Sequence, residues 1–218
     1  IAHVWEGLDK SDQSIVLLEN FIDQNRAPLN HSRGRSYATL KLTLGRMYTN
    51  TQRYGRAEEH LLELSEDTAR TFVPTSYIHA LVLSELSLLL GKQERWMSSL
   101  EYREMARSVT CAGDRDGSFT CLQDLANEAT IVMNMGNYEA AIPVLNRTRS
   151  GFFDALGQDI SNPVVQLLDY NTACARLRAY DEPAANELLD RLDAEALSSI
   201  SQGENWEAKL SALASGTC

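Results

Sequence analysis

Two short segments between residues 122 and 148 carry apolar residues at intervals of three and four, which is typical of amphipathic helices. The apolar residues of the two segments are Leu122, Leu125, Ala129, Val132 and Met133, then Tyr138, Ala141, Ile142 and Leu145. Gly136 lies between the segments and can adopt the left-handed conformation that ends a helix at little cost. Helices this short are marginal alone in water, so each must bury its apolar stripe on a neighbour. The pattern therefore predicts a stack of helix pairs.

The same periodicity predicts helical segments along most of the chain. Residues 11–24 form a helix that Ser11 or Asp12 can cap, with a predicted buried stripe of Ile15, Leu18, Phe21 and Ile22. Further helical segments are expected at 37–69, 75–90, 95–106, 163–192 and 205–213, with a partial first helix around His3, Val4, Trp5 and Leu8. Gly91 is expected to end the strongly apolar helix before it.

The segment from Leu122 resembles a tetratricopeptide repeat (TPR) unit. In that family a small residue lies midway along helix A, a glycine follows at the turn, and an aromatic residue and an alanine follow in helix B. Ala129, Gly136, Tyr138 and Ala141 stand at those places, and copies of such a pattern in register indicate a solenoid. A second copy has Gly45, Tyr54 and Ala57, with Gln52 at the turn, where a different turn geometry is expected.

Two looser copies complete the resemblance. The segment 75–106 has a longer turn, GKQER, and the segment 163–192 has Ala173 and Cys174 at the small positions and Ala185 in helix B. The long helices are similar to the kinesin-light-chain variety of TPR. The resemblance implies an all-α fold, a right-handed superhelix of antiparallel helix pairs. It also implies one domain over 1–218, with about four repeats in 11–192 and a capping helix at 205–214.

The charge of the chain limits the classes of partner. The formal net charge is −10 and the pI is about 4.9, so a nucleic-acid phosphate backbone would be repelled, whereas a basic or neutral peptide would be accepted. The longest apolar run, near residues 86–90, contains Ser87 and is too short to cross a bilayer. The first residue is Ile1, so we expect a processed product or an excised domain.

The four cysteines indicate in which cellular compartment the protein works. Cys111 and Cys121 flank a Gly/Asp loop, and a disulfide there would close a short loop; Cys174 and Cys218 are a second, weaker pairing. An even number of cysteines with one pair so placed favours an oxidising compartment, periplasmic or secreted, in a bacterial type of protein. The alternative is that all four are reduced and the protein is cytoplasmic, with Cys174 a small core residue.

Catalytic and metal-binding patterns are not recognisable in the sequence. His3, His31, His60 and His79 lack a second ligand at metal spacing, no serine has a nucleophile-elbow context, and nucleotide-binding fingerprints are missing. The loop GDRDGSF places Asp114, Asp116 and Gly117 at calcium-loop positions, but the first and twelfth positions are Ala112 and Gln123. The sequence therefore predicts neither an enzyme nor a cofactor.

The candidate binding residues come from the TPR resemblance. In that family an asparagine two residues before the small helix-A position often hydrogen-bonds the backbone of a bound peptide, because an amide both donates and accepts. Asn127 and Asn171 stand at this place, and Thr43 and Val82 are assigned to it in the other two repeats. Thr130, Asn134 and Arg178 are expected near the same face. The alternative is that these residues are merely exposed polar side chains.

The sequence is therefore interpreted as a non-enzymatic scaffold that binds a protein or peptide on its concave face. One alternative is an extracytoplasmic sensor domain of a membrane-anchored regulator or kinase. A helical-repeat hydrolase is a further alternative, which would need a buried cluster of perturbed acids or bases. The sequence does not predict the oligomeric state.

Overall fold

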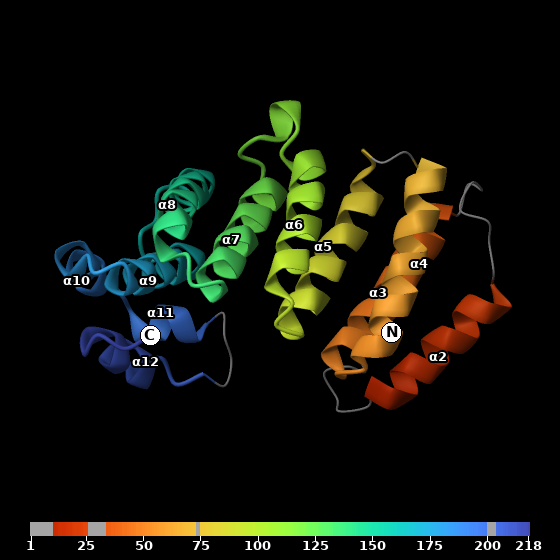
Figure 1. The fold of residues 1–218 in the computed structure, drawn as a ribbon, viewed down its shortest axis with the longest axis horizontal. Helices are drawn as coiled ribbons and strands as arrows, with labels where there is room; N and C mark the ends of the chain where they lie inside the picture. The colour runs from red at the N-terminus through yellow and green to blue at the C-terminus, as the bar shows by residue number, and fades with distance from the viewer. Residues whose placement is uncertain (1–10, 26–33, 73–74, 200–203) are drawn as a thin grey trace. The chain divides into compact units, whose positions relative to one another are not determined.

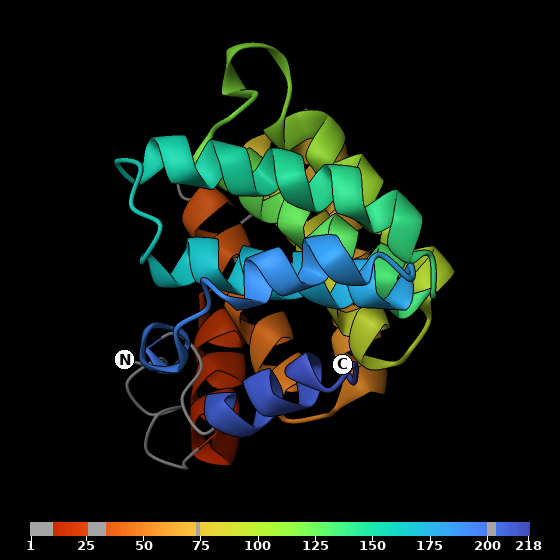
Figure 2. The same ribbon diagram turned by 90° about the vertical axis from the view of Figure 1, so that its left-hand side faces the viewer.

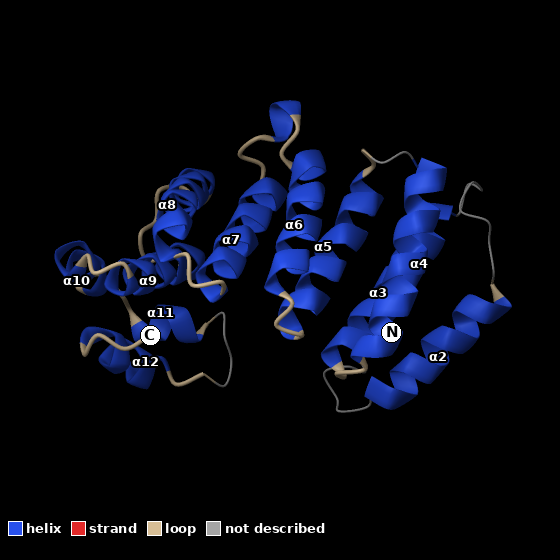
Figure 3. Cartoon of the chain, in the orientation of Figure 1, coloured by secondary structure: helices blue, strands red, loops and turns tan. Residues whose placement is uncertain are grey.

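The chain forms two compact units, 1–110 and 111–218, and the described residues of each are mainly helical (Figures 1 and 3). This computed structural model describes residues 11–25, 34–72, 75–199 and 204–218, and within these residues all regular elements are helical. The partial helix expected around Trp5, and His31, lie outside the described residues. The expectation of one continuous domain over 1–218 stays a prediction.

Unit 1 is built from α2 and two antiparallel helix pairs. Its helices are α2 (Ser11–Gln24), α3 (Gly34–Asn50), α4 (Tyr54–Phe72), α5 (Tyr77–Lys92) and α6 (Trp96–Thr110). Each helix packs on the next in sequence, and α3 also packs on α5. Helices α3 and α5 are therefore the A helices of two consecutive pairs, and α4 and α6 are their B helices.

Unit 2 repeats this arrangement and adds two short helices. After a 3₁₀ turn (Gly113–Arg115) come α7 (Phe119–Asn134), α8 (Tyr138–Ala155), α9 (Pro163–Arg178), α10 (Glu182–Leu189), α11 (Ala194–Ser198) and α12 (Trp206–Ala214). Helices α7 and α9 are the A helices and pack on each other, while α8 lies between them in sequence and packs on both. Helix α12 matches the predicted last helix, but α11, which packs on α9, was not predicted.

The four A–B turns share one conformation, which corrects two sequence interpretations. The turn residues Gln52, Glu94, Gly136 and Tyr180 all have a positive φ, between 59° and 81°. The next residue of each turn donates its N–H to a carbonyl five residues earlier, as in Arg53 to Tyr48 (2.9 Å), which is the Schellman helix ending. Gln52 therefore does not change the turn geometry, and the GKQER turn is not longer than the others, because α5 continues past Gly91 to Lys92.

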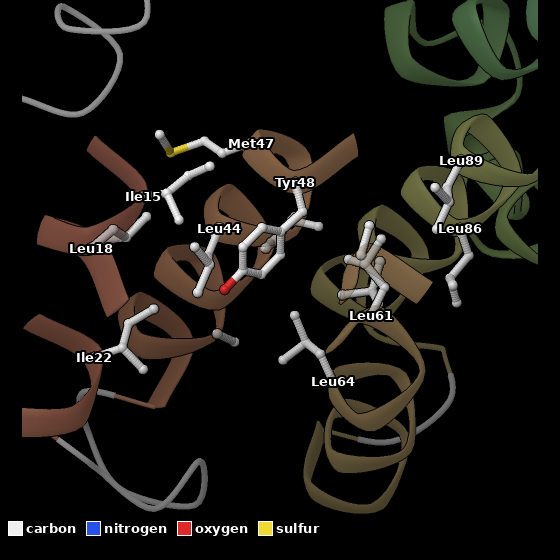
Figure 4. Packing of buried hydrophobic residues seen from close by; sticks show 14 residues of the cluster. Ile15, Leu18, Ile22, Leu44, Met47, Tyr48, Leu61, Leu64, Leu86 and Leu89 are labelled. Atoms are coloured by element: carbon white, nitrogen blue, oxygen red, sulfur yellow. The ribbon is translucent and has the colours of Figure 1, made fainter. Parts of the chain in front are cut away.

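The core of unit 1 shows why small residues recur at the helix contacts (Figure 4). Leu61 of α4 is fully buried against Gly45 of α3, and both belong to a contact between an A helix and its own B helix. Ile15, Leu18 and Ile22 bury one side of α2, as expected. Phe21 is 45% exposed, so its predicted place in the buried stripe is wrong: the helix turns it away from the face that carries Leu18 and Ile22.

Candidate functional site

The four A helices can be aligned residue by residue, because each is followed by a turn with one left-handed residue from which positions are counted back. The turn residues recur at intervals of about 42 residues, and the small helix-A position then falls on Gly45, Ser87, Ala129 and Ala173, all of them buried. In the second pair the small residues Ser87 and Ser99 meet, and the Ser99 hydroxyl donates to the Ser87 carbonyl at 2.7 Å. The position two residues earlier is therefore Glu85. The assignment of Val82 to it is wrong, because the turn at Glu94 makes Ser87 the small position and Val82 lies five residues before it, in the core.

The polar face of α7 is open. Asn127, Thr130 and Asn134 are spaced three and four residues apart, so they lie along one side of the helix, and all three are exposed. The Thr130 hydroxyl donates to the Ala126 carbonyl within the helix at 3.0 Å, which leaves its methyl group and the two amides at the surface. A row of this kind can hydrogen-bond an extended main chain.

The equivalent face of α9 carries Asn171, Cys174 and Arg178 at the same spacing. Asn171 is half-buried. Cys174 is bonded to Cys218, and the Arg178 guanidinium donates to the Cys218 carbonyl at 3.2 Å. We call the six residues on these two faces the A-helix surface of unit 2: Asn127, Thr130, Asn134, Asn171, Cys174 and Arg178. The five predicted binding residues therefore lie at equivalent positions of two helices that pack on each other, and their role in binding stays a prediction.

In unit 1, four of the six equivalent positions are paired across the two A helices. Arg46 of α3 donates to Glu85 of α5 at 2.8 Å, and Lys92 of α5 donates to the Asn50 side chain of α3 at 3.2 Å. Both pairs join neighbouring A helices, and Glu85 is largely buried. In this unit these polar groups therefore hold the two A helices together, whereas Asn127 and Asn171 form no such pair among the residues that the structure describes.

The structure holds both cysteine pairs at bonding distance. Cys111 and Cys121 have Cα atoms 4.9 Å apart and close the loop before α7, as their placement in the sequence indicated. Cys174 and Cys218 have Cα atoms 5.7 Å apart, although they are 44 residues apart in sequence. The second pair fixes the last residue of the sequence to α9.

Asp116, which stands at one of the calcium-loop positions, forms an ion pair with α8. The Asp116 carboxylate accepts a hydrogen bond from Arg147 of α8 at 2.7 Å, which joins the loop to the body of unit 2. The side chain of Asp114 lies outside the described residues. Within the described residues no group of three or more His, Cys, Asp or Glu side chains is placed to hold a metal ion, and no helix there is long and apolar enough to cross a membrane.

Two histidines and one tyrosine of unit 1 have perturbed pKa values. Burial lowers the pKa of His60, even though its Nε2 lies 2.7 Å from the Lys41 carbonyl, and burial likewise lowers the pKa of His79. Burial and the hydrogen bond to Glu19 raise the pKa of Tyr48 to about 12. Tyr48 and His60 meet edge to face at the contact of α3 with α4, with ring centroids 5.9 Å apart, whereas His79 contacts Thr68 where α5 packs on α4. All three side chains therefore belong to the packing between helices of unit 1.

A buried ion pair in unit 2 was not foreseen from the sequence. Arg149 of α8 binds Asp169 of α9 through two hydrogen bonds, 2.7 Å from Nε and 3.2 Å from the second guanidinium nitrogen. The Asp169 side chain is 0% exposed and that of Arg149 is 22% exposed. Neither residue differs in type from the many surface charges, so only the register, which points Asp169 inward, could have revealed the pair.

The geometry defines a TPR-like α-solenoid fold. Solved structures of this class agree: the repeats of a Podosopora anserina kinesin light chain with nearly identical TPR-like repeats have a TM-score of 0.73 at 15% identity, over 93% of this chain and 94% of that one. A point variant of that protein has a TM-score of 0.73 at 16% identity, with 93% of each chain covered. BtubC (BKLC) from P. vanneervenii has a TM-score of 0.75 at 15% identity, over 94% of this chain and 79% of that one.

Sequence comparisons do not extend this result beyond the fold. No protein-family model matches the chain, and no curated protein matches it. At 15–16% identity the solved structures show that the helices are arranged as in kinesin-light-chain TPR-like repeats, and the partners of those proteins are not transferred to this one. The resemblance stated from the four residues around Ala129 is confirmed at the level of the fold.

Proposed function

We propose that this chain is a non-enzymatic scaffold that binds an extended peptide segment of a partner protein on the A-helix surface of unit 2. The observation that carries the proposal is the equivalent placement of Asn127 and Asn171 on two A helices that pack on each other. A bound peptide must keep its backbone groups hydrogen-bonded, because an unsatisfied N–H or C=O that is buried costs about 1–3 kcal/mol. An amide side chain can satisfy both kinds of group.

The partner that suits this surface is basic. The chain carries a net charge of −10, which attracts Lys- and Arg-rich segments over distances up to about a Debye length, near 10 Å at 0.1 M salt. Electrostatic attraction of this kind raises the association rate more than the final affinity. Binding to a basic peptide should therefore weaken with increasing salt, mainly through slower association.

The test is a pull-down from native extract, followed by calorimetry with the recovered partner. The variant Asn127→Ala with Asn171→Ala is expected to lose about 1–3 kcal/mol of binding free energy while keeping its melting temperature. The matched control is Asn146→Ala with Asn186→Ala, since these exposed asparagines lie on the B helices α8 and α10. Unchanged affinity in the first variant would overturn the proposed site.

We further propose that the protein works in an oxidising compartment, periplasmic or secreted. The support is that all four cysteines lie in pairs at bonding distance, whereas cytosolic proteins keep their thiols reduced. Peptide mapping of protein purified from its source under alkylating, non-reducing conditions tests this proposal. Free thiols at all four positions would contradict it and favour a cytoplasmic protein.

A further inference from the structure

Helix α12 and the residues after it cover part of α9. Helix α12 lies on the side of α9 away from α8 in both views (Figures 1 and 2) and packs on α10 and α11. Three contacts join it and the residues after it to α9. The Trp206 ring meets the Tyr170 ring edge to face, with centroids 5.2 Å apart, Cys218 is bonded to Cys174, and the Cys218 carbonyl accepts a hydrogen bond from Arg178.

These contacts fall on one line along α9. Tyr170, Cys174 and Arg178 are successive residues four apart, so they share one stripe of the helix surface. Two of them belong to the A-helix surface defined above, and Asn171 is next to the stripe. Asn171 is half-buried, whereas Asn127, its equivalent on α7, is exposed. The A-helix surface of unit 2 is thus exposed to solvent on α7 and partly covered by residues 204–218 on α9.

The covering segment is attached to α9 itself at its two ends. Trp206 is 3% exposed and begins α12, and Lys209 stacks over the Trp206 ring 4.8 Å from its centroid. At the other end the disulfide and the Arg178 hydrogen bond hold Cys218. Between them Leu213 is buried, the rest of α12 is exposed or half-buried, and the helix also packs on α10 and α11. A nine-residue helix has little stability of its own, so it depends on these attachments.

We propose that residues 204–218 form a thiol-controlled cover of the A-helix surface on α9, which opens when the Cys174–Cys218 disulfide is reduced. The reductant is a dithiol. Its thiolate attacks one sulfur, the S–S bond breaks, and the mixed disulfide is then released by the second thiol of the reductant. Both protein sulfurs end as thiols after taking up two protons, and the dithiol leaves as a disulfide. This regulation rests on the proposed function, because it concerns access to the same site.

The closed cover lowers the affinity of any partner that needs Asn171. A peptide binds only the open form, so its apparent affinity falls in proportion to the fraction of molecules that are open. The disulfide keeps that fraction small, since it holds Cys218 against α9 even when Trp206 detaches transiently. Asn127 on α7 stays exposed in either state, so the cover changes the length of the available surface and does not remove it.

The first experiment measures whether residues 204–218 separate from α9, and it needs no binding partner. Hydroxyl-radical footprinting with mass spectrometry measures the exposure of Trp206 and Tyr170 in the whole chain, before and after treatment with dithiothreitol, and in the variant Cys218→Ser. A several-fold rise in labelling of both rings on reduction and in the variant is expected. The matched control is Cys111→Ser with Cys121→Ser, which removes the other disulfide of unit 2 and should leave the labelling of Trp206 and Tyr170 unchanged in the absence of dithiothreitol.

Cys218 is exposed and follows the last helix, so its replacement by serine leaves the core of unit 2 intact. Circular dichroism of the variant checks that the helical content is retained. Unchanged labelling of Trp206 and Tyr170 after reduction and in Cys218→Ser would overturn the proposal, whatever the partner.

The second experiment separates the cover from the proposed function. Calorimetry compares the recovered partner's affinity for oxidised protein and for Cys218→Ser, and the proposal expects a several-fold gain in the variant. If footprinting shows release but the affinity is the same, the regulation is overturned. The proposed peptide site is then tested by the Asn127 and Asn171 variants alone. If those asparagine variants also bind normally, the proposed function fails as well.

Discussion

Leu61 of α4 occupies the space that a β-carbon on Gly45 of α3 would need. A Cβ built at Gly45 would lie 2.5 Å from Cδ2 of Leu61 and 2.9 Å from its Cγ, and Leu61 is fully buried and has no room to move. The close approach of α3 and α4 therefore depends on the absence of a side chain at position 45. In unit 2 the positions equivalent to Gly45 and Leu61 are Ala129 and Leu145, both fully buried.

Replacing Gly45 or Ala129 with leucine should overpack these helix contacts and lower the free energy of unfolding by about 1–3 kcal/mol. Chemical denaturation of the purified variants measures the loss. The matched control is Gly55→Ala, because Gly55 lies in α4 with nothing within 4 Å of an added Cβ. That change should be neutral or stabilise the protein by about 0.4–1 kcal/mol. Wild-type stability in both leucine variants would show that the register is wrong.

The Arg149–Asp169 pair supplies a second stability prediction. Arg149→Met leaves the fully buried Asp169 carboxylate without its bidentate partner, so it should cost about 3–5 kcal/mol. Adding Asp169→Leu removes the stranded charge and should restore most of that loss. The surface pair of Arg147 with Asp116 is the control: both side chains are 57% exposed, and Arg147→Ala should cost about 0–1 kcal/mol. Equal losses for the two arginine variants would contradict this account of unit 2.

The stability of unit 1 should fall with acidification below about pH 6.5. Burial lowers the pKa values of His60 and His79 beneath the ordinary 6.5, so in this range the unfolded chain binds more protons than the folded one. Stability then increases with pH, is fully present above pH 6.5, and is lost as the pH falls through the folded-state pKa values. The melting temperature measured from pH 7.5 to 5 should show this decrease.

The control for this pH dependence is the double variant His60→Gln with His79→Asn. Glutamine can keep the hydrogen bond that His60 makes to the Lys41 carbonyl, and asparagine can keep the polar contact of His79 with Thr68, at 3.0 Å. Neither amide titrates, so the decrease should be smaller in the variant. An identical pH profile would show that other groups cause the acid sensitivity.

The loop disulfide is expected to stabilise unit 2. Closing the short loop between Cys111 and Cys121 contributes about 2–3 kcal/mol in the chain-entropy account, so Cys111→Ser with Cys121→Ser should lower the denaturation midpoint by a corresponding amount. Non-reducing peptide mapping must first recover Cys111 linked to Cys121. Two free thiols there, or a stability that does not respond to reduction, would contradict the assignment.

The fold was predictable from the sequence because it rests on local signals. Apolar periodicity located the helices from 11 to 192, and the four residues around Ala129 gave the class of repeat. The turns were misjudged because a left-handed residue was expected to be glycine, whereas Gln52, Glu94 and Tyr180 also adopt that conformation when the Schellman hydrogen bonds hold them. The misjudged turn at Glu94 led directly to the wrong choice of Val82 in place of Glu85.

The candidate site was predictable only in part. The spacing of Asn127, Thr130 and Asn134 placed them on one helical face without any tertiary information. The contact of Arg178 with Cys218, and that of Tyr170 with Trp206, depend on how the segment after α10 folds back on α9, which no local pattern encodes. Long-range contacts of this kind could not be derived from periodicity alone.

Photo-crosslinking from the A-helix surface tests the central claim most directly. With p-benzoylphenylalanine in place of Thr130 on α7, ultraviolet irradiation in native extract should give one dominant crosslinked partner, and adding Asn127→Ala with Asn171→Ala should diminish that product. The same probe in place of Asn146, exposed on the B helix α8, should give little or none of it. A product that forms equally from position 146, or survives the asparagine changes undiminished, would show that the partner does not bind at this surface.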